Sequence, residues 1–107
     1  MNRFIIAHLP QEIAQSLCDK HVVKMVLEEA QMLCTVVRKA NPEFADDHNL
    51  YRLAHANHPC TLWAGTTRSN YMYSFRLWNH IASEYEYRYG KVHASQRHLD
   101  AIREGAK

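Results

Sequence analysis

The amino-acid sequence predicts a single all-α domain over residues 1–107, a compact helical bundle with an extended N-terminal arm. At 107 residues the chain is too short for two independent cores, and its 47% hydrophobic fraction is enough for one. Only three glycines and three prolines are present, which favours long helices over a turn-rich β-fold. Two long segments also carry apolar residues at helical spacing.

The N-terminal segment is expected to form an ordered arm. Residues 3–9 are strand-like but have no predicted partner strand, so we expect them to pack in extended form against the helices. Pro10 suits the first turn of a short helix that ends at Leu17, because its missing N–H costs nothing there. The apolar run from Phe4 to Ala7 is too brief for a signal-peptide core or a membrane span.

The main helix is predicted from Lys20 to about Lys39. Asp19 precedes it as an N-cap whose carboxylate would accept hydrogen bonds from the first turn, and Asn41-Pro42 ends it. Apolar residues cover well over half of its circumference, so we expect the helix to be central.

The polar residues of the main helix fall at steps of three and four, on one narrow row that we call the polar seam. The seam consists of His21, Lys24, Glu28, Gln31 and Thr35. It faces either solvent or a cleft, where a histidine, a lysine and a carboxylate would shift one another's pKa. Glu29 falls among apolar residues instead, at a helix edge or against another subunit.

Shorter elements follow. A polar connection carries a helical turn over residues 50–55, and residues 59–67 form one or two further turns. Ser69 is expected to cap a second long helix, which stops at Gly90, a typical residue after a helix end. An amphipathic stretch over residues 94–103 completes the bundle.

The second long helix carries two rows of residues. One is expected to pack on the main helix and consists of Tyr71, Phe75, Trp78, Ala82 and Tyr85. The other is polar and aromatic and consists of Tyr73, Arg76, His80, Glu84 and Arg88. This second row is either an edge of the core or a surface that stacks a base and holds phosphate.

Charge and cysteines restrict the function only loosely. A net charge of +2 with eight histidines permits nucleic acid, nucleotides or neither. Three cysteines, an odd number without a leader peptide, argue against a secreted disulfide scaffold and favour the cytoplasm. Cys34 lies on the apolar face and is expected in the core rather than as a nucleophile.

No metal or cofactor is expected. His55, His58 and Cys60 are close in sequence, but no second pair completes a four-ligand zinc site, and His58 more naturally caps the segment after Pro59. A glycine-rich phosphate loop and a dinucleotide-binding fingerprint are both absent from the sequence.

The run LCDKHVVKMVLEEAQML, residues 17–33, resembles the opening helix of the phage pyrimidine-dimer DNA glycosylases of the endonuclease V type. That family has an Asp, a His two residues later and a Glu seven beyond it, which correspond here to Asp19, His21 and Glu28. Residues 58–91 are similar in layout to a later helix of the family. The chain also resembles small uncharacterised phage proteins with DKHVVKM, NHPC and RYGK runs, and the likeness covers about two thirds of it.

The resemblance implies that the N-terminal arm reaches the glutamate and that the N-terminal amine attacks the sugar carbon of a damaged nucleotide. Glu28 would be the catalytic carboxylate with His21 beside it, and the amine would belong to Met1, because Asn2 is too large for removal of the initiator residue. The family has an arginine before its glutamate for gripping a distorted duplex, and this chain has Leu27. A free nucleotide, a single strand or a modified base would suit the modest charge better.

Three functions follow from this sequence. The first is a glycosylase-like enzyme, with or without lyase chemistry, that acts at an N-glycosidic bond through Glu28, His21 and Met1. The second is a non-catalytic phage protein that sequesters a host signalling nucleotide, and the third is a structural helical interaction module. Partners are a nucleotide or nucleic acid, with no membrane and with a homo-oligomer allowed; a phage protein would work in the host cytoplasm. The expected ligand-binding residues are Lys24, Gln31, Asn70, Tyr73, Arg76, His80 and Arg88.

Overall fold

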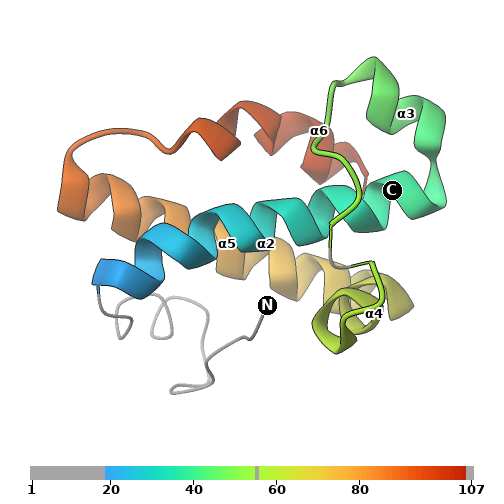
Figure 1. The fold of residues 1–107 in the computed structure, drawn as a ribbon, viewed down its shortest axis with the longest axis horizontal. Coiled ribbons are helices and arrows are strands. Elements are labelled where there is room, and N and C mark those ends of the chain that lie inside the picture. The colour runs from blue at the N-terminus through green and yellow to red at the C-terminus, as the bar shows by residue number, and fades with distance from the viewer. Residues whose placement is uncertain (1–18, 55, 106–107) are drawn as a thin grey trace.

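Two antiparallel helices of 22 residues each, α2 (Asp19–Ala40) and α5 (Arg68–Tyr89), pack against each other at the centre of the fold (Figure 1). The computed structural model describes residues 19–54 and 56–105, and side chains from residue 21 onward. The remaining elements are α3 (Pro42–Asp47), α4 (Pro59–Thr66), the 3-10 helix η1 (Ala94–His98) and α6 (Leu99–Glu104). No strand occurs in these ranges, so the predicted all-α class is confirmed.

The core forms where the apolar sides of α2 and α5 meet. The fully buried side chains include Trp78, Met32 and Leu33, and of the row expected on α5 only Tyr85 is less than buried. The prediction that the main helix is central is therefore confirmed. Glu29 is 0% exposed, so neither position expected for it, a helix edge or a subunit contact, describes this residue.

The start of α2 and the segment after it differ from the prediction. Asp19 is the first residue of the helix rather than its N-cap. The polar connection after α2 begins with helix α3, and residues 50–54 are not helical. Asn41 explains the difference, because its side chain accepts a hydrogen bond from the Phe44 N–H and Pro42 occupies the first turn. An Asn-Pro pair that ends one helix can thus begin the next.

Histidine and threonine cap the two following helices. His58 Nδ1 accepts a hydrogen bond from the Cys60 N–H at 3.1 Å, which confirms its predicted capping role at α4. The predicted cap of α5 was wrong: Thr67, in extended conformation, accepts from the Asn70 N–H, and Ser69 already lies inside the helix. Gly90 ends α5 at a φ of 71°, a left-handed conformation that glycine adopts without strain, as predicted.

The C-terminal segment, η1 and α6, returns along α2 (Figure 1). Trp78 Nε1 donates a hydrogen bond to Ser95 Oγ, and Ile102 is fully buried. The predicted arm over residues 3–9 and the helix to Leu17 lie outside the described residues. None of the helices described has the length and hydropathy that a membrane span requires.

Candidate functional site

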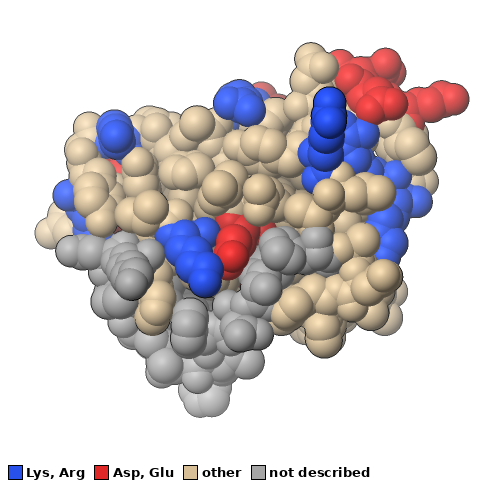
Figure 2. Space-filling model, viewed as in Figure 1, with Lys and Arg blue, Asp and Glu red and all other residues tan. Residues whose placement is uncertain are grey.

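The polar seam of α2 passes from the surface into the core. Lys24 is exposed, Glu28 and Gln31 are half-buried, and Thr35 is fully buried. In Figure 2, basic and acidic side chains lie together over α2, with uncharged surface above them. An open solvent face therefore describes only the Lys24 end of the row, and the alternative of a cleft stays a prediction.

Glu28 holds the least satisfied polar atom of the seam. Its Oε2 is buried and has no hydrogen-bond partner in the part of the chain that the structure describes. Lys24 lies one turn earlier, the spacing at which a lysine and a glutamate often pair, yet no ion pair joins these two side chains. Because buried polar atoms are nearly always hydrogen-bonded in folded proteins, an exception of this kind is a candidate functional group.

The other catalytic residues are placed to different degrees. His21 lies seven residues, about two helical turns, before Glu28 and is half-buried, with an interaction partner of its own. Met1 lies outside the described residues. The structure therefore places the carboxylate and the histidine on one face of α2 and leaves the predicted nucleophile untested.

Thr35 has a structural role. Its Oγ1 donates a hydrogen bond to the Ala54 carbonyl oxygen at 3.1 Å and accepts one from the Ala54 N–H at 3.0 Å. These two hydrogen bonds satisfy the backbone N–H and carbonyl groups of Ala54, which lies outside any helix. The buried end of the seam thus anchors the connection between α3 and α4.

The predicted ligand-binding residues of α5 fall into two groups. Asn70, Tyr73 and Arg76 lie in its first half, beside α4, and His80 and Arg88 lie in its second half. Two of these side chains have internal partners: Asn70 Nδ2 donates to the Trp63 carbonyl oxygen at 2.9 Å, and Arg88 Nε lies 2.9 Å from Glu84 Oε1.

The surroundings of Tyr73 and Arg76 differ from those of Asn70 and Arg88. The Tyr73 ring meets the Trp63 ring edge to face, with centroids 5.8 Å apart. Arg76 is exposed and makes no hydrogen bond or ion pair with any described residue. Of the expected set on α5, these two are the residues best placed to meet a ligand.

A hollow of about 260 Å³ lies on this part of α5. Its lining consists of Arg68, Ser69, Met72 and Arg76. Arg68 was not among the residues predicted from the sequence, although its spacing of eight residues from Arg76 places both on one face of a helix. The sequence pattern could have revealed this pair, since no acidic residue stands between the two arginines.

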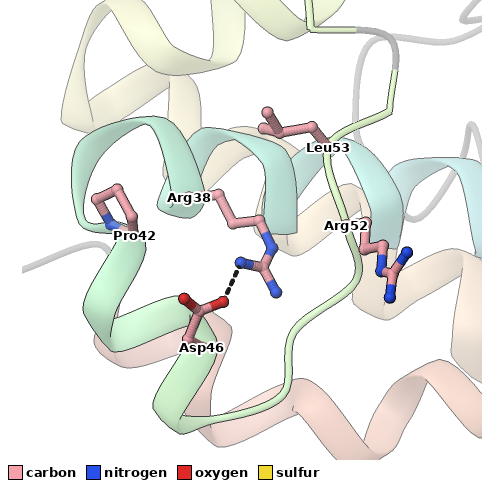
Figure 3. Close-up of a pocket in the computed structure, with 5 residues that line it drawn as sticks. All are labelled: Arg38, Pro42, Asp46, Arg52 and Leu53. Atoms are coloured by element: carbon pink, nitrogen blue, oxygen red, sulfur yellow. Dashed lines mark hydrogen bonds and ion pairs between the residues drawn. The ribbon is translucent and has the colours of Figure 1, made fainter.

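A larger hollow, of about 500 Å³, lies between α2, α3 and the connection after α3, and Figure 3 shows its lining. The Arg38 guanidinium points at the Asp46 carboxylate, with Nη1 at 2.6 Å from Oδ1. Arg38 also donates hydrogen bonds to the carbonyl oxygens of Tyr51 and Leu50 at 2.7 and 2.8 Å. The charge of Arg38 is therefore neutralised within the fold, and its contacts at this hollow are structural.

Cys34 and His58 serve the fold. Burial raises the pKa of the Cys34 thiol to about 11, which confirms its place in the core and makes it a poor nucleophile. His58 uses Nδ1 for its cap, and His55, which was weighed with it as a zinc ligand, lies outside the described residues.

Comparison with protein families, with curated proteins and with solved structures finds no match to this chain. The arguments for its function therefore rest on two features of the chain itself. They are the Glu28 oxygen on α2 that has no partner among the described residues, and the arginine-lined hollow on α5 with the neighbouring rings of Tyr73 and Trp63.

Proposed function

We propose that this protein is a glycosylase-like enzyme that cleaves the N-glycosidic bond of a nucleotide or a DNA base, with Glu28 as its key carboxylate. The observation that carries the proposal is the buried Oε2 of Glu28, which has no hydrogen-bond partner among residues 19–54 and 56–105. Leaving a buried polar atom unpaired costs about 1–3 kcal/mol, so a side chain held in this way is better explained by a ligand than by stability.

The chemistry of the bond needs such a group. When an N-glycosidic bond breaks, positive charge develops on the sugar, and a carboxylate shielded from water stabilises that charge far better than an exposed one. Glu28 has a lone pair available for this purpose. Lys24, exposed one turn away, is placed to attract the phosphate of the same nucleotide.

The nucleophile in this proposal is the N-terminal amine of Met1, as the resemblance to the endonuclease V type implies. Its lone pair would attack the sugar C1′ while the base leaves with the electrons of the N-glycosidic bond and takes up a proton. Opening of the sugar ring then gives an imine between protein and sugar. The proposed setting is the cytoplasm, that of the host if the chain comes from a phage.

Borohydride trapping tests the proposal. Incubation with DNA that contains an abasic site, in the presence of borohydride, should reduce the imine to a stable adduct with the combined mass of protein and DNA. Glu28→Gln should lower base release by roughly a hundredfold or more while leaving the helical circular dichroism unchanged. Glu86→Gln, which removes an exposed carboxylate of α5, is the matched control and should keep full activity.

Two outcomes would contradict the proposal. One is the absence of both adduct and base release across abasic, damaged and modified substrates. The other is a Glu28→Gln variant as active as the unaltered protein.

A second candidate is a non-catalytic protein that sequesters a nucleotide. The aromatic pair of Trp63 and Tyr73 beside the exposed Arg76 favours it. An aromatic ring can stack on a base while a guanidinium binds the phosphate of the same nucleotide. Mass spectrometry of a bound nucleotide before and after long incubation separates the two candidates. An unchanged nucleotide supports sequestration, and a released base supports the enzyme.

A further inference from the structure

We infer that the first half of α5, together with Trp63 of α4, binds a single-stranded nucleic acid. A backbone phosphate would lie in the hollow between Arg68 and Arg76, and a neighbouring base would stack on Trp63. The inference names a single strand as the substrate of the proposed enzyme, and this part of it rests on the proposed function. The binding itself can be tested without catalysis.

Two unpaired guanidiniums share the hollow. Arg68 and Arg76 both line it, both are exposed, and neither makes a hydrogen bond or ion pair with a described residue. No carboxylate of a described residue lines the hollow. Arg38, by contrast, is paired with Asp46 at 2.6 Å. Two like charges on one hollow repel each other, and a bound phosphate would remove that repulsion through charge-assisted hydrogen bonds.

The position of Arg68 points the same way. It is the first residue of α5, at the positive end of the helix dipole, where a cation is unfavourable. No acidic residue occupies the first turn to compensate for its charge. Arg68 therefore does not serve the stability of the helix, and a ligand of opposite charge gives it a role.

An aromatic surface adjoins the hollow. Trp63 is 43% exposed, and its ring is fixed by an edge-to-face contact with Tyr73 at 5.8 Å. Tyr73 follows Ser69 of the hollow by four residues and precedes Arg76 by three, so these three side chains are neighbours on one helix face. Asn70 Nδ2 holds the carbonyl oxygen of Trp63 and keeps α4 in place against α5.

A positively charged groove with an exposed ring beside it is the arrangement that binds single strands, because every unstacked base offers a flat face to an aromatic side chain. Duplex bases are already stacked on one another and cannot use Trp63 in this way. The small net charge of +2 also provides few contacts for the dense phosphates of a duplex.

The test measures the binding of a fluorescent ten-nucleotide oligothymidylate at several salt concentrations. The double variant Arg68→Gln/Arg76→Gln should lose at least tenfold in affinity, and the slope of log K against log salt should fall by about 1.4, or 0.7 for each lost phosphate contact. Trp63→Leu should lose roughly tenfold and should abolish the quenching of tryptophan fluorescence by the oligonucleotide. The remaining tryptophan, Trp78, is fully buried and is not expected to respond.

Arg52 provides the matched control. It is an exposed arginine on the larger hollow, which also contains Asp46, so Arg52→Gln removes the same charge from a different place. This variant should bind as the unaltered protein does. An equal loss for Arg52→Gln and Arg68→Gln would overturn the inference, and so would full binding by Trp63→Leu or equal affinity for a duplex of the same length.

The results also separate the inference from the proposed function. Glu28→Gln should bind the oligonucleotide normally. If binding depends on Arg68 and Trp63 but no adduct is ever trapped, the proposed enzyme fails and the binding surface stands. If adducts form and the arginine variants bind as before, the enzyme stands and the inference fails.

Discussion

The hydroxyl of Tyr71, on α5, donates a hydrogen bond to the backbone carbonyl oxygen of Ile102, on α6, across 2.6 Å. Both residues are buried, and they are 31 positions apart in the chain. Burial raises the pKa of the Tyr71 phenol above its ordinary value, so the group remains a protonated donor. This bond ties α6 to the central helix pair, as the bond from Trp78 to Ser95 ties η1.

Tyr71→Phe should therefore destabilise the protein. It leaves the buried Ile102 carbonyl without this donor, and we expect the free energy of unfolding to fall by about 1–3 kcal/mol. Urea denaturation followed by circular dichroism measures the change. Tyr87→Phe removes a hydroxyl from a side chain that is 85% exposed and should have no effect. Equal stability of the two variants would show that the bond contributes nothing.

Thr35→Val tests the anchor of the connection between α3 and α4. The shape of the side chain is retained, but the Ala54 N–H and carbonyl both lose their partner, so we expect a loss of about 1–3 kcal/mol. Thr66→Val, at an exposed position of α4, is the control. Hydrogen exchange should also become faster at Ala54, and a protected Ala54 amide in the variant would contradict the assignment.

Loss of charge at Glu28 and at Glu29 should have different effects on the stability of the protein. Glu28→Gln removes the charge of a carboxylate whose buried Oε2 makes no hydrogen bond with a described residue, so stability should stay within about 0.5 kcal/mol or rise. Glu29→Gln changes a fully buried group that has a partner and should cost about 1–3 kcal/mol. Thermal unfolding of both variants decides. Strong destabilisation by Glu28→Gln would mean that this carboxylate supports the fold.

Stability should fall in mild acid because of two histidines near η1. Burial, and secondarily the charge of Lys91, lowers the pKa of His93, and burial with Arg97 lowers that of His98. The unfolded chain, where histidine titrates near pH 6.5, then binds more protons than the folded one. The stabilisation is complete above that pH and is lost as the pH falls from about 6.5 toward the lowered folded values.

The hydrogen bonds of these two histidines also predict that stability falls in mild acid. His93 Nδ1 accepts a hydrogen bond from the Ser95 N–H at 3.0 Å, and His98 Nε2 accepts one from Arg97 Nε at 3.2 Å. A proton on either acceptor nitrogen would break its bond. Urea denaturation at pH 7.5 and 5.5 measures the effect, and the double variant His93→Asn/His98→Gln should flatten it. His48→Gln, at an exposed position, should leave the pH dependence as it is.

Cys34 should resist alkylation in the folded protein. It is fully buried, and a thiol with a pKa of about 11 is only about one part in a thousand thiolate at pH 8. Peptide mass spectrometry after iodoacetamide treatment should find Cys34 unmodified in native buffer and modified in urea. Rapid modification of the native protein at this residue would place it outside the core.

The two long helices could be predicted because hydrophobic periodicity repeats over five or six turns and outweighs local ambiguity. Short elements lacked that repetition. In the turn predicted over residues 50–55, the described part, residues 50–54, is instead non-helical chain held by Arg38 and Thr35. Helix α3 begins at Asn41-Pro42, where only the end of the main helix was expected. The cap at Thr67 rather than Ser69 depended on backbone angles, which two hydroxyl residues so close in sequence leave open.

By itself, the sequence determined the helical class, the central place of α2 and the row that holds Glu28, because one turn of helix relates residues that are three or four apart. Only the tertiary structure decided which residues of that row are buried, which arginines have partners, that Arg68 and Arg76 line one hollow, and that Trp63 packs against Tyr73. The physical reason is that burial and pairing arise between elements distant in the chain, and no local spacing encodes them.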